Sequence, residues 1–153
     1  MPKEIMTRKA SDNEYLHKDF HLAMNTGIDY LHKKYGEHAV REYLKRFAKN
    51  FYAPLTEALK TRGLVALKEH FEHIYKVERS NANITLKDDE LTISVDICPA
   101  VEYIRKNNAK VADLFYETTK TVNETICEGT PYAFELIEYN QETGGGTQRF
   151  YRR

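Results

Sequence analysis

Cys98, which directly precedes Pro99, is the strongest candidate for a chemically reactive residue in this chain. A residue before proline is pushed toward extended geometry, and proline suits the first turn of a helix, so Cys98 is predicted at a helix N-terminus. Free backbone N–H groups and the helix dipole at such a position lower the pKa of a thiol and favour a nucleophilic thiolate. The alternative is a buried cysteine that only fills space, because free cysteine is among the most buried residue types.

Two histidines are candidates for the proton carrier that a catalytic thiol needs. His21 lies between Phe20 and Leu22, where it is expected to reach a pocket, and His70 forms a spacing-three pair with His73 on a predicted helix. Such a pair can touch one metal ion. No Cys/His cluster accompanies it, so we expect no metal and no other cofactor. A hydrogen-bonded or solvated histidine is the alternative for each.

Aromatic and polar side chains further along the chain are candidates for substrate binding. Tyr116 and Glu117 are expected to present polar groups to a cavity, and Arg149 is a candidate anchor for a substrate carboxylate. Arginines near a terminus are usually solvated, which is the alternative for Arg149. The tyrosines considered as cavity-lining residues, each with a ring and one hydroxyl, are Tyr103, Tyr116, Tyr132 and Tyr139.

The glycine run at 144–146 follows Thr143 and has the composition of a phosphate-binding loop. Such a loop needs a helix after it, with the helix N-terminus aimed at the anion. Strand-like residues, 147–151, follow here instead. The sequence therefore favours a hairpin in which glycine supplies unusual backbone geometry.

Composition restricts the classes of partner. Lys and Arg total 23, as do Asp and Glu, so the formal net charge is zero. A chain without net charge lacks the field that draws a protein to nucleic acid or to an anionic membrane surface. No apolar run approaches the roughly 18 residues that span a bilayer, and two cysteines are too few for a disulfide framework. We expect a cytoplasmic protein with a small-molecule ligand and with no nucleic-acid or membrane partner.

The chain is predicted to form a single domain, 1–153. The secondary structure that must position these residues changes from helical to strand-containing near residue 80. Residues 1–13 show no periodicity and are expected to be a flexible terminus. Apolar spacing of three and four predicts a helical half over 14–79. Its helices are expected at 14–35, 37–60 and 64–78, with a kink or restart near Ala53 because Pro54 cannot continue the second one. The first two are amphipathic and could pair between copies in a homo-oligomer.

The second half, 80–153, has the pattern ββααββ. Apolar residues alternate in the strand segments, and Pro99 ends one of them. The segments are a hairpin with strands near 84–86 and 91–97, helices at 99–106 and 111–128, and a hairpin with strands at 132–139 and 147–151. The fold class is therefore α+β: N-terminal helices packed on a four-stranded antiparallel sheet of two hairpins, with two helices between the hairpins.

Several short motifs resemble the L-2-amino-thiazoline-4-carboxylic acid hydrolase-like family. They are Cys98-Pro99, Leu114 to Glu117, Glu128 to Pro131 and Gly146 to Phe150, with a similar outline in the helical half around Tyr35 to Ala39. The resemblance implies a cytoplasmic α+β domain that opens a cyclic amidine-like ring bearing a carboxylate. It also implies a small-ligand cavity between helices and sheet, as in the 4-vinyl reductase domains that the family is similar to in outline. Cys98 matches the family's cysteine before proline, whereas Tyr116 and Gln148 stand where members often carry cysteine.

Two functions follow as expectations. The first is a hydrolase-like enzyme that acts on a cyclic C–N or C–S bond, with Cys98 as nucleophile or oxyanion-side helper and His21 or His70 as proton carrier. The second is a non-catalytic small-ligand-binding module with an aromatic-lined cavity.

Overall fold

The computed structural model describes residues 18–153, so the predicted flexible terminus at 1–13 and the predicted helix start at 14 lie outside the described residues. Its helices are α1 (Asp19–Tyr35), α2 (Glu37–Phe51), α3 (Ala53–Arg62), α4 (Leu64–Val77), α5 (Pro99–Lys106) and α6 (Glu117–Cys127). Its strands are β1 (Ala82–Lys87), β2 (Glu90–Ile97), β3 (Tyr132–Tyr139) and β4 (Gly144–Arg152).

Local residues explain where the N-terminal helices break. Gly36, between α1 and α2, and Gly63, between α3 and α4, have φ of 92° and 71°, a backbone region that glycine enters without steric cost. Pro54 stands in the first turn of α3, and α2 ends at Phe51. The predicted restart near Ala53 is therefore confirmed, because proline has no N–H to donate to the preceding turn.

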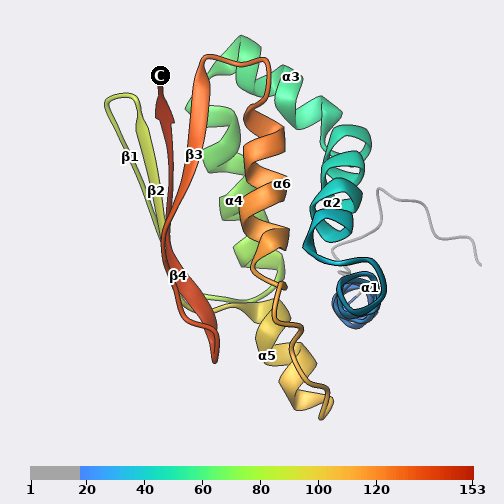
Figure 1. Cartoon of the computed structure of the whole chain (residues 1–153). Helices are drawn as coiled ribbons and strands as arrows, with labels where there is room; N and C mark the ends of the chain where they lie inside the picture. The colour runs from blue at the N-terminus through green and yellow to red at the C-terminus, as the bar shows by residue number, and fades with distance from the viewer. Residues whose placement is uncertain (1–17) are drawn as a thin grey trace, which may run out of the picture.

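The four strands form one antiparallel sheet in the order β1-β2-β4-β3. Each predicted hairpin is present, and the two join through β2 and β4, where Ile93 pairs with Gln148 and Leu91 with Phe150. Figure 1 shows α4 and α6 along one face of this sheet, with α2 beyond α6 and α5 near one end of the strands. The predicted α+β class is confirmed, including the two helices between the hairpins.

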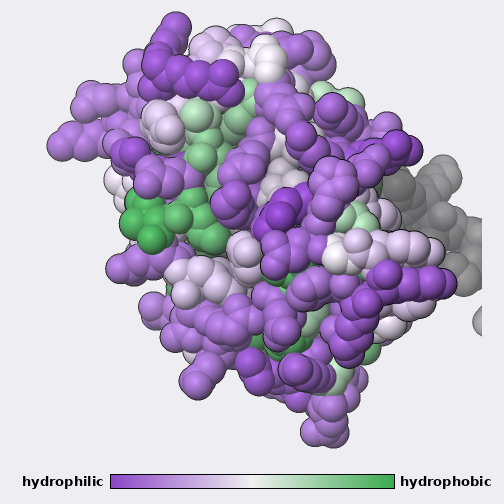
Figure 2. Space-filling view, viewed as in Figure 1, coloured by the Kyte–Doolittle hydropathy of each residue, from purple (hydrophilic) through white to green (hydrophobic). Residues whose placement is uncertain are grey.

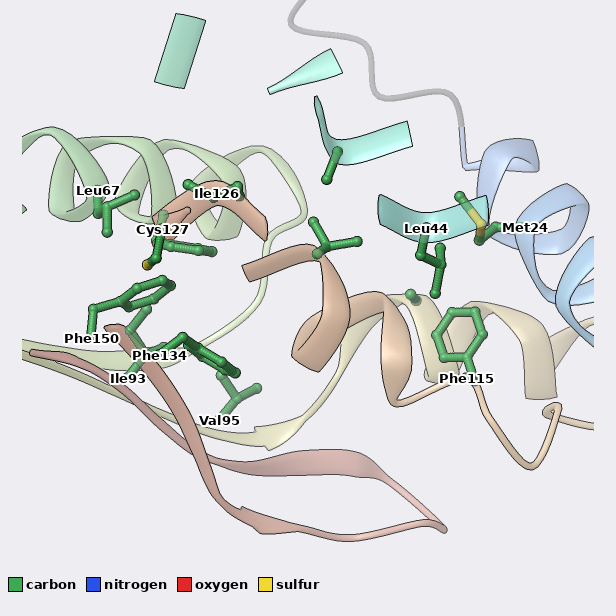
Figure 3. Close-up of a cluster of buried hydrophobic side chains, with 14 of the residues drawn as sticks. Met24, Leu44, Leu67, Ile93, Val95, Phe115, Ile126, Cys127, Phe134 and Phe150 are labelled. Carbon is green, nitrogen blue, oxygen red and sulfur yellow. The ribbon is translucent and has the colours of Figure 1, made fainter. Parts of the chain in front are cut away.

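The core fills the space between the sheet and its helices. Phe150 of β4 is fully buried, and its ring centroid lies 5.0 Å from that of Phe134 and 5.6 Å from that of Phe71. Figure 3 shows this cluster beside Leu67 and Ile126, and the core continuing toward α1 and α2. Burial of each such side chain contributes on the order of 1.5–3 kcal/mol relative to exposure.

The predicted start of the long helix at 111 is wrong, because α6 begins at Glu117. The preceding residues form tight turns, in which the N–H of Phe115 donates to the carbonyl of Ala112 and the N–H of Glu117 to that of Leu114. A distant side chain holds this segment, since the backbone N–H of Ala112 donates to Asn25 Oδ1 at 2.8 Å. This contact ties the segment before α6 to α1.

The surface is largely hydrophilic in the view of Figure 2, with a compact apolar patch over the strand layer. The large apolar residues exposed on the strands are Ile97 and Ile137, each 48% exposed. Within residues 18–153, the helices are too short or too polar to cross a bilayer.

Candidate functional site

Cys98 is the residue that caps α5, as the sequence predicted. Its φ of −71° and ψ of 125° are extended, and Pro99 occupies the first helical position. Burial is the largest influence on the thiol and raises its pKa, while the N–H groups of Val101 and Ala100 at the start of α5 lower it. The carboxylate of Glu78 raises the pKa further. The net direction is thus opposite to the expected lowering, because desolvation outweighs the helix N-terminus.

A small cavity lies against Cys98, between the sheet, α4 and α6. Its volume is about 40 Å³, and its wall includes Tyr75, Tyr139, Thr119 and Gln148. Burial raises the pKa of Tyr139 to about 12 and also raises that of Tyr75, and proximity to Cys98 adds to both shifts. A space of this size holds a few water molecules or the end of a larger ligand. Tyr139 was among the tyrosines predicted to line a cavity.

The glycine run forms part of this wall. Gly144 has φ of 69°, and a Cβ there would collide with the side chains of Val101 and Cys98. At Gly146 a Cβ would collide with the backbone of Glu138 on β3. The predicted hairpin is confirmed, since β4 begins at Gly144 and no helix follows the glycines.

Glu78, at the C-terminal end of α4, connects Cys98 with His21. His21 Nε2 lies 2.8 Å from Glu78 Oε1, and the two side chains are 16% and 4% exposed. The same carboxylate raises the pKa values of Cys98 and Tyr75. Glu78, an acidic residue that the sequence analysis did not name, therefore contacts His21 and acts electrostatically on Cys98.

A larger cleft, lined in part by Glu78, lies between the turn after α4 and helix α5. Its volume is about 300 Å³. Side chains of both charges line it: Lys18, Glu78, Arg79, Asp96, Glu102 and Lys106. Within the described part of the chain, Lys106 pairs with Glu102 at 2.7 Å, while Lys18, Arg79 and Asp96 form no ion pair. Tyr103, another predicted cavity residue, also lines this cleft.

His70 lies in a different part of the molecule from Cys98. Its ring contacts Tyr52 and Phe71, with centroid distances of 5.8 and 5.2 Å. Burial lowers the pKa of His70, and His73 lowers it further. Within residues 18–153, no group of three or more His, Cys, Asp or Glu side chains is arranged to hold a metal ion.

The two candidate binding residues on α6 have different positions. Tyr116 packs against Tyr139, which lines the Cys98 cavity, and the centroids of the two rings lie 5.8 Å apart. Glu117 is buried and accepts hydrogen bonds from Arg41 Nε, at 3.0 Å, and from the Thr121 hydroxyl. Glu117 therefore links α6 to α2, and both of its oxygens are occupied within the protein.

Arg149 lies on the face of the sheet away from the helices. It alternates along β4 with Gln148 and Phe150, which are buried on the helix-covered face. Its guanidinium lies 2.7 Å from Glu135 and 3.5 Å from Glu90. The structure does not bring Arg149 together with Cys98.

The sequence carries one signal for the residue that was missed. Along α4 the apolar positions Leu67, Phe71, Ile74 and Tyr75 recur at helical spacing, and Glu78 falls on the same stripe. A carboxylate in phase with an apolar stripe is expected to be buried and to need a partner.

Comparison with family models and with curated proteins gives no match to this chain. Membership of the hydrolase-like family stays a prediction that depends on the short motifs and on the position of Cys98.

Proposed function

We propose that the protein is a small-ligand-binding domain and that its ligand occupies the cleft between the α4–β1 turn and α5. The volume of about 300 Å³ reaches the lower end of the range for small-molecule sites. The cavity beside Cys98, at about 40 Å³, has room only for the tip of such a ligand. This proposal retains the predicted small-ligand-binding module but places its ligand in the polar cleft rather than in an aromatic-lined cavity.

The observation that carries the proposal is the set of cleft charges that no described residue pairs. Arg79 supplies positive charge and Asp96 negative charge, and neither forms an ion pair with another described residue, while Lys18 adds positive charge that also acts on Glu102. Most other charged groups near the surface pair locally, as Lys106 does with Glu102. Unpaired groups of both signs around one concave site favour a small polar metabolite that carries charge.

The experiment is a ligand screen on the full chain, read by backbone amide NMR shifts. Small carboxylates, amines and amino acids are expected to shift the amides of Ser80, Asn81 and Ile97, which line the cleft. Arg79→Gln is expected to weaken binding of carboxylates, whereas Arg46→Gln, on the exposed side of α2, is the matched control. A panel that shifts no cleft amide contradicts the proposal.

Hydrolysis at Cys98 is the second candidate. The Ala100 and Val101 N–H groups, which lower the pKa of the thiol, favour it, because donors at a helix N-terminus stabilise a thiolate or an oxyanion. Glu78, held by His21, would receive the thiol proton as nucleophilic attack begins. Cys98→Ala should then abolish release of a new thiol from L-2-amino-thiazoline-4-carboxylic acid. No release by the unaltered protein, or equal release by the variant, contradicts this candidate.

Pairing of two copies through the first helices is a separate proposal about partners. Exposed aromatic side chains on α1 and α2 support it: Phe20 is 48%, Tyr43 45% and Phe51 65% exposed. Scattering-coupled size-exclusion chromatography tests it, and a monomer at high concentration contradicts it.

A further inference from the structure

Glu78 carries an unsatisfied oxygen. Among buried side-chain nitrogen and oxygen atoms of the described residues, Glu78 Oε2 is the one without a hydrogen-bond partner. The side chain is 4% exposed, and its other oxygen is occupied by His21 Nε2 at 2.8 Å. Buried polar atoms are nearly always paired, and an unpaired acceptor of a charged group is destabilising. The carboxylate is therefore held in place with half of its accepting capacity unused.

We infer that Glu78 Oε2 accepts a hydrogen bond from a primary ammonium group of the ligand in the cleft. The inference rests on the proposed function, because Glu78 lines that cleft. A carboxylate is an acceptor only, so its partner must bring an N–H or O–H donor. A cationic donor forms a bond roughly twice as strong as a neutral donor does.

The geometry also selects among cations. A guanidinium binds a carboxylate best through two parallel hydrogen bonds, which require both oxygens. Glu78 Oε1 is already engaged with His21, so one oxygen remains. A compact ammonium, with three donors around one nitrogen, fits a single acceptor and leaves its other donors for neighbouring groups.

The remaining charges of the cleft suit the rest of such a ligand. Asp96 adds a second carboxylate, and Lys18 and Arg79 offer positive charge to an anionic end. Oε2 itself is covered, so the ammonium reaches it only after a side chain of the wall turns aside. Lys18 and Lys106 are exposed, long side chains of the cleft wall that change rotamer at small cost.

The test compares four probes of equal chain length: butylammonium, butylguanidinium, butyrate and butanol. The full chain is titrated while NMR follows the Glu78 side-chain carboxyl carbon and the amides of Ser80 and Asn81. Butylammonium is expected to shift all three signals and to bind more tightly than the other probes. Glu78→Gln is expected to weaken butylammonium binding at least about tenfold, while the matched control Glu42→Gln, on the exposed side of α2, leaves it unchanged.

Each outcome decides the inference. Equal binding to unaltered protein and Glu78→Gln overturns it, as does a shift of the cleft amides without a shift of the Glu78 carboxyl carbon. If butyrate shifts the cleft amides and butylammonium does not, the ammonium inference fails and the proposed cleft function stands. If neither these probes nor the wider panel shifts a cleft amide, the proposed function fails as well. Should the Glu78 variant not fold, the carboxyl signal of the unaltered protein gives the answer.

Discussion

His21 Nε2 lies 2.8 Å from Glu78 Oε1, across 57 residues of sequence. The pair joins the first turn of α1 to the C-terminal end of α4, and both side chains are largely buried. Glu78 also influences the thiol of Cys98. The carboxylate of Glu78 therefore contacts α1 directly and acts electrostatically on the strand–helix junction where the chemistry was predicted.

Replacing His21 with alanine is expected to reduce the free energy of unfolding by about 1–3 kcal/mol, because both oxygens of Glu78 then lack partners. The double variant His21→Ala/Glu78→Ala should lose less than the sum of the two single variants, since no unpaired carboxylate remains. Urea denaturation of the four proteins measures this coupling. Strictly additive losses would show that the two side chains do not interact energetically.

Cys98 should react slowly with iodoacetamide at pH 7, because burial raises its pKa and leaves little thiolate. The rate is expected to rise about tenfold per pH unit until the thiolate forms. Peptide mapping separates Cys98 from Cys127, which is 1% exposed and whose pKa burial raises to about 12. Cys127 is the internal control and should react more slowly still. Rapid labelling of Cys98 at pH 7 would contradict the neutral thiol and strengthen the hydrolase candidate.

Gly144→Ala should destabilise the protein by about 1–3 kcal/mol, because the new methyl group meets Val101 and the backbone has φ of 69°. Gly27→Ala is the matched control, since a Cβ there meets nothing within 4 Å inside α1. That control should stabilise by about 0.5–1 kcal/mol. Thermal unfolding compares the two, and equal effects would mean that the hairpin tolerates a side chain.

Arg41→Met is expected to cost about 1–3 kcal/mol, because it removes a charged donor from buried Glu117. The side chain of Arg41 is 42% exposed, so water compensates in part. Arg46→Met removes a comparable contact to Glu42, where the two side chains are 77% and 51% exposed, and should cost less than about 1 kcal/mol. Chemical denaturation measures the free energy of unfolding of both variants, and equal losses would show that the buried partner of Arg41 makes no difference.

His70 should make the protein less stable in mild acid. Burial lowers its pKa in the folded state, so the unfolded chain, with a histidine pKa near 6.5, takes up the proton first as the pH falls. Stability from this group is present above about pH 6.5 and declines as the pH falls toward the folded value. His70→Gln should flatten the pH dependence of the unfolding free energy between pH 7.5 and 5.5, whereas His38→Gln, at a 92% exposed side chain, should leave it unchanged. The same slope in both variants would exclude His70 as the cause.

Local sequence features explain the parts of the fold that were predicted correctly. Gly36 and Pro54 break the helices where expected. Glycine adopts a backbone conformation that ends a helix, and proline lacks the N–H that would continue one, so both effects are local. Alternating apolar residues in 91–97 likewise predicted a strand with one buried face. The start of α6 at Glu117 was not predictable in this way, because the segment before it packs on α1, where Asn25 accepts a hydrogen bond from Ala112.

The sequence by itself determined that Cys98 stands at a helix N-terminus, because the steric demands of Pro99 act on adjacent residues. Only the tertiary structure decided the consequence for the thiol, since desolvation depends on every element that packs around it. The tertiary structure likewise joined Glu78 to His21 and placed Arg149 on the opposite face of the sheet. Such contacts arise between residues far apart in the chain, where neither spacing nor composition fixes which side chains meet.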